Sequence, residues 1–209
     1  MSISDKLAEL NRERFQAFDP EPADDLGVQA ALAFAGDTYE GLAARDLDAD
    51  GLVWAQDRVR ILSGLYGLLR PLDRIQPYRL EMGTRLKTRR GGSLYDFWGD
   101  RISHQLNADA EGHADPVLIN LASQEYFGAI DARALKLPVI TPHFREEKDG
   151  ESRIISFFAK KARGGMARFA IDERIDRSEA LKAYDRDGYR FAPLASTATD
   201  WIFTRSGNN

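Results

Sequence analysis

The stretch RVRILSGLYGLLRPLDRIQPYRLEMG, residues 58–83, combines helix-like apolar spacing with two glycines. Its apolar residues recur at spacings of three and four, as the buried face of a helix requires: Ile61, Leu62, Leu65, Leu68 and Leu69. Gly64 and Gly67 interrupt the run, and glycine readily adopts the positive φ of a tight turn. The pattern predicts a helix, a tight turn and a second short helix.

The same stretch opens a strongly basic segment. Residues 58–90 hold nine Arg or Lys residues against Asp73 and Glu81, a net charge of +7, whereas the whole chain carries −4. Residues 1–50 hold twelve acidic and four basic residues, a net charge of −8. Because segregated charge focuses an electrostatic field on one face, the chain can attract a polyanion despite its acidic average.

Four motifs resemble the YaaA family of bacterial peroxide-stress resistance proteins. They are LSGLYGLLRPLDRIQPYRLEMG at residues 62–83, YDFWGD at residues 95–100, INLASQEY at residues 119–126 and IISFFAKKARGGMARF at residues 154–169. The similarity covers nearly the whole chain. It implies one α/β domain of unusual topology, a helix-hairpin-helix element, a positively charged cleft, DNA binding and protection against hydrogen peroxide.

The resemblance also implies a segment ahead of the position that Met1 occupies here. Family members begin with a leading strand and an SPAKT-like segment, and Met1 falls where they already read ISDKLA. If that segment supplies a strand beside residues 116–122, this chain leaves an exposed sheet edge. We then expect lower stability and more self-association than in a full-length version.

Length and composition narrow the class of protein. The 209 residues fit one α/β (mixed α+β) domain over residues 1–209, with a central mixed sheet and surrounding helices. The absence of cysteine excludes disulfides, thiolate nucleophiles and Cys-based zinc sites. No run of about 18 apolar residues and no signal-peptide pattern occur. We expect a cytoplasmic monomer without membrane contact.

Local patterns predict the surrounding elements. Helices are expected at residues 4–18, 23–34 and 93–108, the last with a capping-box pattern from Ser93 and Asp96. A buried strand at residues 116–122, a Ser123-capped helix and a strand from Val139 form a β-α-β unit. Asp149-Gly150 predicts a hairpin between residues 139–146 and 153–158, and closing strands are expected near residues 189–191 and 201–204.

The first candidate DNA contact is the glycine turn at residues 63–67. Free amides at the start of the helix after the turn can bind a phosphate, with arginines beside them. The set comprises Arg58, Arg60, Ser63, Gly64, Tyr66, Gly67, Arg70 and Arg74. The alternative is an ordinary corner between two helices; the resemblance favours DNA binding, because the family's helix-hairpin-helix element falls in this region.

The second candidate surrounds Gly164-Gly165 and comprises Lys160, Lys161, Arg163 and Arg168. A helix that follows a strand ending at Phe158 would aim its free amides and both lysines at one anion. The alternative is a solvated helix start, but a lysine-rich first turn opposes the helix dipole unless an anion is present. Side chains held on a helix lose less conformational entropy on binding than side chains in a loop. We therefore expect this pair of lysines to contribute more to DNA affinity than Arg89 and Arg90 in the loop.

The third candidate is a polar set that a core does not need. Its members are Tyr78, Arg79, Glu81, Tyr95, Trp98, Asn120, Ser123, Glu125 and Tyr126, of which Tyr78, Arg79, Asn120 and Ser123 are expected to contact DNA. Asn120 and Ser123 should lie beyond the carboxyl end of a strand, where ligands of α/β folds collect. Alternatives are a core position for Trp98, a helix cap for Ser123 and an ion pair between Arg79 and Glu81.

Three functions fit these features. The first is a DNA-binding protein of the peroxide stress response that contacts phosphates and shape, with low sequence specificity. The second is a lyase- or glycosylase-like enzyme acting on damaged nucleic acid or a nucleotide, with Lys160 or Lys161 as nucleophile and Glu125 or Glu81 as acid or base. The third is a scaffold that binds proteins through its acidic N-terminal helices.

The histidines do not predict a metal site. His104, His113 and His143 are scattered along the chain, without the HxxH or ExxH spacing that brings ligands together on one helix. We therefore expect no metal, no bound iron and no cofactor.

Overall fold

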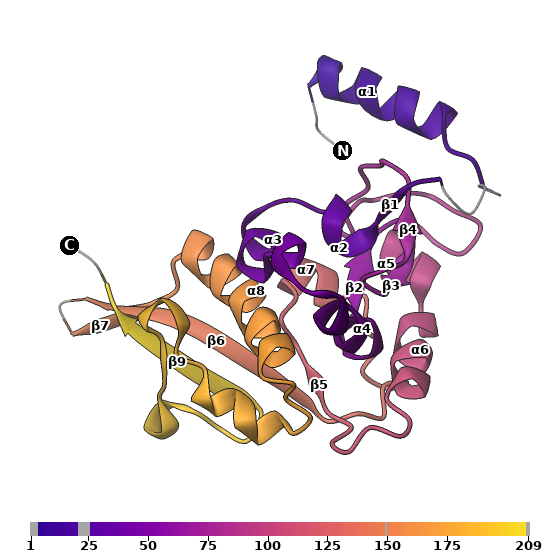
Figure 1. Ribbon diagram of the computed structural model, residues 1–209. Helices are drawn as coiled ribbons and strands as arrows, with labels where there is room; N and C mark the ends of the chain where they lie inside the picture. The colour runs from indigo at the N-terminus through magenta and orange to yellow at the C-terminus, as the bar shows by residue number, and fades with distance from the viewer. Residues whose placement is uncertain (1–3, 21–25, 149, 208–209) are drawn as a thin grey trace.

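The predicted β-α-β unit lies at one edge of a mixed sheet in the computed structural model, which describes residues 4–20, 26–148 and 150–207 (Figure 1). Strand β5 (Leu118–Ile119) runs parallel to β6 (Val139–Lys148), and α7 (Gln124–Phe127) connects them. The sheet has the order β5-β6-β9-β8, with β9 (Asp200–Ser206) parallel to β6 and β8 (Arg190–Phe191) antiparallel to β9. The short β7 (Glu151–Arg153) pairs with the end of β6. The expected mixed α/β class is confirmed.

Helix α8 (Ser156–Asp172) covers one face of this sheet. Alternate residues of β6 are buried, as a strand with one covered face requires. Phe144 of β6 packs with Met166 of α8, with Phe203 of β9 and with Tyr184 and Tyr189 from the segment between them. These side chains form the first hydrophobic cluster of the protein.

Two further clusters lie on the other side of α8. One is built from α2 (Ala30–Ala33), α3 (Asp37–Leu42), α4 (Ala49–Arg58), β2 (Ile61–Ser63) and β3 (Gly67–Leu69). The other is built around α5 (Leu94–Trp98) and α6 (Arg101–Asp109). The remaining elements are α1 (Asp5–Gln16), β1 (Val28–Gln29), β4 (Arg74–Ile75), η1 (Ala44–Asp46), η2 (Ser178–Ala183), η3 (Arg186–Gly188) and η4 (Pro193–Ala195).

Within residues 58–83, residues 61–69 form a β-hairpin, so the predicted helix, turn and second helix are wrong. Strands β2 and β3 pair antiparallel, with Ile61 opposite Leu69 and Ser63 opposite Gly67. These four residues are buried while Leu62 and Leu68 are partly exposed, which is the alternation of a strand. A short apolar run is compatible with the repeat of a helix and with that of a strand. Here the pairing of the two strands and the positive φ of 76° at Gly67 favour the hairpin.

Several predicted boundaries also shift. Gly99, with a φ of 54°, divides the helix predicted at residues 93–108 into α5 and α6, while the Ser93–Asp96 capping box is confirmed. Of the helix predicted at residues 23–34, residues 23–25 lie outside the described residues, and the rest forms β1 and the short α2. The strand expected to reach Phe158 ends at Arg153, and α8 begins at Ser156. Asp149 of the predicted hairpin lies outside the described residues.

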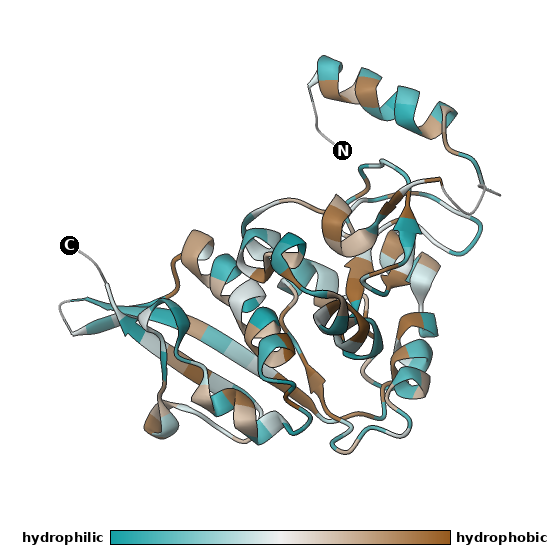
Figure 2. Ribbon diagram, in the orientation of Figure 1, coloured by the Kyte–Doolittle hydropathy of each residue, from teal (hydrophilic) through white to brown (hydrophobic). Residues whose placement is uncertain are grey.

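Helix α1 stands apart from the rest of the fold in Figure 1, although Figure 2 shows that it carries hydrophobic residues. Leu10 and Phe15 are 39% and 42% exposed. Across residues 4–20, 26–148 and 150–207, no helix is long and apolar enough to span a bilayer.

Candidate nucleic-acid interface

The glycine turn is held by protein groups. The Ser63 hydroxyl bonds the Tyr78 hydroxyl at 2.5 Å and accepts from the Tyr66 amide at 2.9 Å. Trp98 Nε1 donates to the Gly64 carbonyl at 3.1 Å, and a Cβ on Gly67 would lie 2.6 Å from the Trp98 ring. Both glycines do permit a close approach, but the approaching groups belong to the protein: this indole at Gly67 and the Leu80 carbonyl at Gly64. The expectation of helix-start amides beside this turn is wrong, because no helix follows it.

Arginines near the hairpin bind protein oxygens. Arg60 donates from Nε to Asp109, and Arg70 Nη2 lies 3.5 Å from the same carboxylate. Burial alone would raise the pKa of Asp109, but hydrogen bonds from Arg60 and Gln105 outweigh burial and lower it. The other predicted contacts in this region are also engaged: Arg58 with Asp57 at 2.7 Å, Arg74 with the Gly27 carbonyl at 2.9 Å and Arg79 with Glu81 at 2.9 Å. These side chains already hold protein partners, and the Arg79–Glu81 alternative is confirmed.

The α8 candidates occupy a different position from the one predicted. Because α8 begins at Ser156, the lysines lie in its second turn, away from the free amides, so the predicted basic first turn is wrong. Lys160 Nζ lies 3.6 Å from Asp37 Oδ2, whereas Lys161 is exposed with no carboxylate within 4 Å among the described residues. Burial lowers the pKa of the Arg163 guanidinium, which lines a cavity. Arg168 donates to Asp172 and to the Ala43 carbonyl, at 2.8 and 2.9 Å.

Gly164 and Gly41 bring α8 and α3 together. A Cβ on Gly164 would overlap the Thr38 carbonyl oxygen, and a Cβ on Gly41 would overlap the Lys161 carbonyl oxygen. The close approach that we predicted at Gly164-Gly165 therefore serves helix packing in this structure. Its neighbour Gly165 faces the Tyr184 hydroxyl.

The exposed loop before α5 carries four cations that form no ion pair among the described residues. In this basic turn, residues 85–90, the Thr88 amide donates to the Gly91 carbonyl at 2.8 Å and the Arg90 amide donates to Thr88 Oγ1 at 3.1 Å. Arg90 also stacks on Phe97, 5.2 Å from the ring centroid. All four cations are exposed and, among the described residues, have no carboxylate within 4 Å: Arg85, Lys87, Arg89 and Arg90. Two hydrogen bonds at Thr88 therefore hold this turn together.

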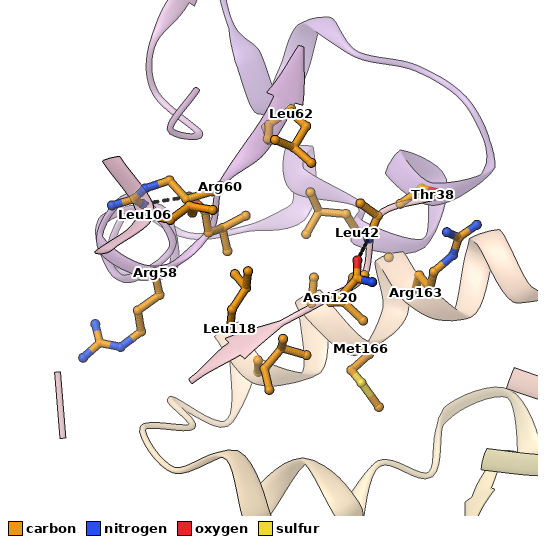
Figure 3. Close-up of a pocket in the computed structure, with 18 of the residues that line it drawn as sticks. Thr38, Leu42, Arg58, Arg60, Leu62, Leu106, Leu118, Asn120, Arg163 and Met166 are labelled. Atoms are coloured by element: carbon orange, nitrogen blue, oxygen red, sulfur yellow. Dashed lines mark hydrogen bonds between the residues drawn. The ribbon is translucent and has the colours of Figure 1, made fainter. Parts of the chain in front are cut away.

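A cavity of about 820 Å³ lies between the three clusters. Figure 3 shows Leu62 and Leu118 on facing walls, with Arg60 toward one end and Arg163 toward the other. Asn120 follows the carboxyl end of β5, as predicted, and it also lines this cavity. Its Oδ1 accepts from the Ala122 amide at 3.1 Å.

Other polar residues of the third candidate have structural partners. Ser123 caps α7 by accepting from the Tyr126 amide at 3.3 Å, which confirms that alternative. Glu125 accepts from the Gly83 amide at 2.8 Å. Lys160 and Glu125 both line the cavity, while Glu81 does not. Each candidate nucleophile or base that is named here therefore holds a protein partner, with Lys161 as the exception.

Helix α3 contributes to the cavity, which the sequence did not predict. Asp37, Thr38 and Tyr39 line it together with Arg163 and Asn120. Burial raises the pKa of the Tyr39 hydroxyl, and burial raises the pKa of Tyr78 to about 12 despite its hydrogen bond with Ser63. The matching glycines at positions 41 and 164 were the available signal that α3 and α8 meet.

The histidines pair with single carboxylates. His104 lies 3.4 Å from Asp100, His113 lies 3.4 Å from Asp57 and His143 lies 2.8 Å from Asp200. Within the described ranges, no group of three or more His, Cys, Asp or Glu side chains could hold a metal ion.

Comparison with known proteins identifies the family. The family described as "Peroxide stress protein YaaA" matches residues 1–195. A UPF0246 protein of Caulobacter vibrioides (strain NA1000 / CB15N) is 69% identical over 205 residues, which cover 98% of this chain and 80% of that protein. UPF0246 proteins of Phenylobacterium zucineum (strain HLK1) and Ruegeria pomeroyi (strain ATCC 700808 / DSM 15171 / DSS-3) are 64% and 57% identical, each over 98% of this chain and over 76% and 80% of their own lengths. The chain belongs to the YaaA family of peroxide stress proteins.

Proposed function

We propose that this protein binds DNA through the phosphate backbone as part of the bacterial response to peroxide. The observation that carries the proposal is the basic turn, whose four exposed cations have no described carboxylate within 4 Å. The turn gathers these four cations within six residues, which makes it a concentrated source of available positive charge. The family to which the chain belongs supplies the link to peroxide stress.

The geometry of the turn suits phosphate contacts. Two hydrogen bonds at Thr88 hold the turn, so Arg89 and Arg90 at its tip need little further ordering to meet a phosphate. Guanidinium groups bind phosphate oxygens with charge-assisted, often bidentate hydrogen bonds. Phosphate contacts carry no sequence information, so we expect low sequence specificity. The net charge of −4 repels DNA from the rest of the surface and favours binding through this turn.

Salt dependence of binding tests the proposal. Fluorescence anisotropy of a labelled duplex, titrated with the protein at several salt concentrations, gives log K against log salt. If about four phosphates are neutralised, the slope should be roughly −3.6. A salt-independent affinity, or no binding at low salt, would contradict electrostatic DNA binding.

A further inference from the structure

The basic turn is shaped by its own hydrogen bonds, but these do not attach it to the rest of the protein. The Thr88 amide donates to the Gly91 carbonyl at 2.8 Å, and the Arg90 amide donates to Thr88 Oγ1 at 3.1 Å. Each bond joins residues no more than three positions apart, so the two bonds fix the shape of the turn and not its orientation. The orientation depends on contacts with neighbouring elements.

The chain leaves the turn against the Asp96 carboxylate of α5. Asp96 Oδ2 accepts from the Gly92 amide at 3.0 Å, from the Ser93 amide at 3.1 Å and from Ser93 Oγ at 2.8 Å. A Cβ on Gly91 would lie 2.2 Å from the Cβ of Asp96, so the close approach requires glycine. One carboxylate therefore holds the two residues that follow Gly91.

Helix α5 is itself fixed to the protein. Leu94 is 3% exposed and belongs to the cluster built around α5 and α6. Trp98 Nε1 donates to the Gly64 carbonyl at 3.1 Å, which ties α5 to the hairpin of β2 and β3. The Arg90 guanidinium lies 5.2 Å from the centroid of the Phe97 ring. Helix α5 therefore joins the basic turn to the core.

We propose that Asp96 is a positioning residue for DNA binding, which holds the basic turn so that Arg89 and Arg90 meet the phosphates in a fixed orientation. This inference rests on the proposed function. A turn that is already fixed loses less conformational entropy when it binds a phosphate. The three hydrogen bonds to Asp96 suit this role, because bonds to an ionised acceptor are stronger than bonds between neutral groups.

Charge alone gives the opposite expectation for Asp96. Its side chain is exposed at the end of the basic turn, so its negative charge repels the same phosphates that the arginines attract. If Asp96 acted only through this charge, its removal would strengthen DNA binding. If Asp96 positions the turn, its removal weakens DNA binding although the protein becomes less acidic. The two roles therefore differ in the sign of the effect.

The variant Asp96→Ala removes the acceptor together with the charge. Anisotropy of a labelled duplex at fixed salt should show about tenfold weaker binding, the loss expected when one more backbone residue must be ordered. The slope of log K against log salt should stay within about 0.5 of its original value, because the same phosphates are neutralised. In the protein without DNA, hydrogen exchange at the Gly92 amide should become at least about tenfold faster, because that amide loses its acceptor.

Two further variants separate position from charge. Asp96→Asn removes the charge but keeps an oxygen that accepts from backbone amides, so it should bind within about twofold of the original affinity. Asp100→Ala removes the same charge from an exposed carboxylate that lies 3.4 Å from His104, and it should leave the affinity unchanged or raise it. Circular dichroism checks that each variant is folded. If Asp96→Ala does not fold, Asp96→Asn decides in its place, and binding more than about threefold tighter than the original would assign only a charge effect.

The proposed function and this inference fail in different ways. If the unsubstituted protein does not bind DNA, both are wrong. If it binds, and folded Asp96→Ala binds equally well or more tightly, only the positioning role of Asp96 is wrong. An equal loss of affinity in Asp96→Ala and Asp100→Ala would also overturn that role, because the loss would then not depend on the contacts of Asp96 with the turn.

Discussion

The Asp109 carboxylate binds two arginines of the basic segment at residues 58–90, which the sequence predicted to contact DNA. It accepts from Arg60 and Arg70, which lie 49 and 39 positions away in the chain, and its side chain is only 9% exposed. Gln105 donates to the same carboxylate at 2.7 Å. The buried pair therefore ties β2 and the end of β3 to α6.

Replacing this carboxylate should destabilise the protein. We expect Asp109→Asn to lower the free energy of unfolding by about 3 kcal/mol at neutral pH, because it leaves a buried guanidinium without its counter-ion. Urea denaturation measures the change. The exposed pair of Asp57 and Arg58 provides the control, since Asp57→Asn should cost no more than about 1 kcal/mol.

The same pair predicts a pH dependence. Because the pKa of Asp109 is lower in the folded protein than its ordinary value, its contribution to stability is fully present above the unfolded pKa of about 4 and is lost as the pH falls through the folded pKa. The stability difference between the wild type and Asp109→Asn should therefore stay constant between neutral pH and about pH 5 and shrink below about pH 4. A difference that is unchanged at the lowest pH where both proteins fold would contradict the assignment.

At the scale of elements, glycine contacts between α3 and α8 set the distance between two helices. Alanine normally favours a helix over glycine by about 1 kcal/mol. We nevertheless expect Gly164→Ala to destabilise the protein by about 2 kcal/mol or more, because its Cβ overlaps the Thr38 carbonyl and forces the helices apart. Thermal and urea denaturation measure the cost. Gly92→Ala, where a Cβ meets nothing within 4 Å, should be nearly neutral.

The positions of the two basic elements lead us to expect the opposite order of their contributions to DNA affinity. The lysines of α8 lack the helix-start amides that made them the stronger candidate, whereas the basic turn is held by two hydrogen bonds. We expect the double variant Arg89→Ala, Arg90→Ala to weaken DNA binding by about 2 kcal/mol and to reduce the salt slope by up to about 1.8. Anisotropy at several salt concentrations measures both quantities.

Two double variants serve as comparisons. Lys160→Ala, Lys161→Ala should cost less than the change in the basic turn, because Lys160 already pairs with Asp37. Arg133→Ala, Lys136→Ala removes the same charge from another exposed part of the surface and should cost least. A larger loss for the α8 variant than for the turn variant, with both folded, would move the DNA site to α8.

At the scale of the whole molecule, stability should be unevenly distributed. Helix α1 has 12 residues, stands apart in Figure 1 and buries only Asn11, whereas β6, β9 and α8 enclose the first hydrophobic cluster. An isolated helix of this length is marginal in water. We expect hydrogen exchange of the α1 amides to be at least about a hundredfold faster than that of β6. Comparable protection in α1 and β6 would show that α1 packs against another surface in solution.

Local sequence alone determined the family, the β-α-β unit and the ends of several helices. Ser93 and Asp96 lie three residues apart, as a capping box requires, and Asp48 caps α4 by accepting from the Gly51 amide at 2.7 Å. Such features depend on residues within one turn of each other, so the printed order of residues is sufficient to find them.

Only the tertiary structure decided the hairpin, the pairing of the arginines and the cavity. The run from Ile61 to Leu69 fits a helix and a strand equally well, and the burial of alternate residues chose the strand. Whether an arginine is available depends on a partner that can lie 49 positions away, as Asp109 does from Arg60. The cavity forms between elements that are distant in the chain, such as α3, β5 and α8. These properties arise from contacts between segments far apart in the chain, which composition, spacing and periodicity do not encode.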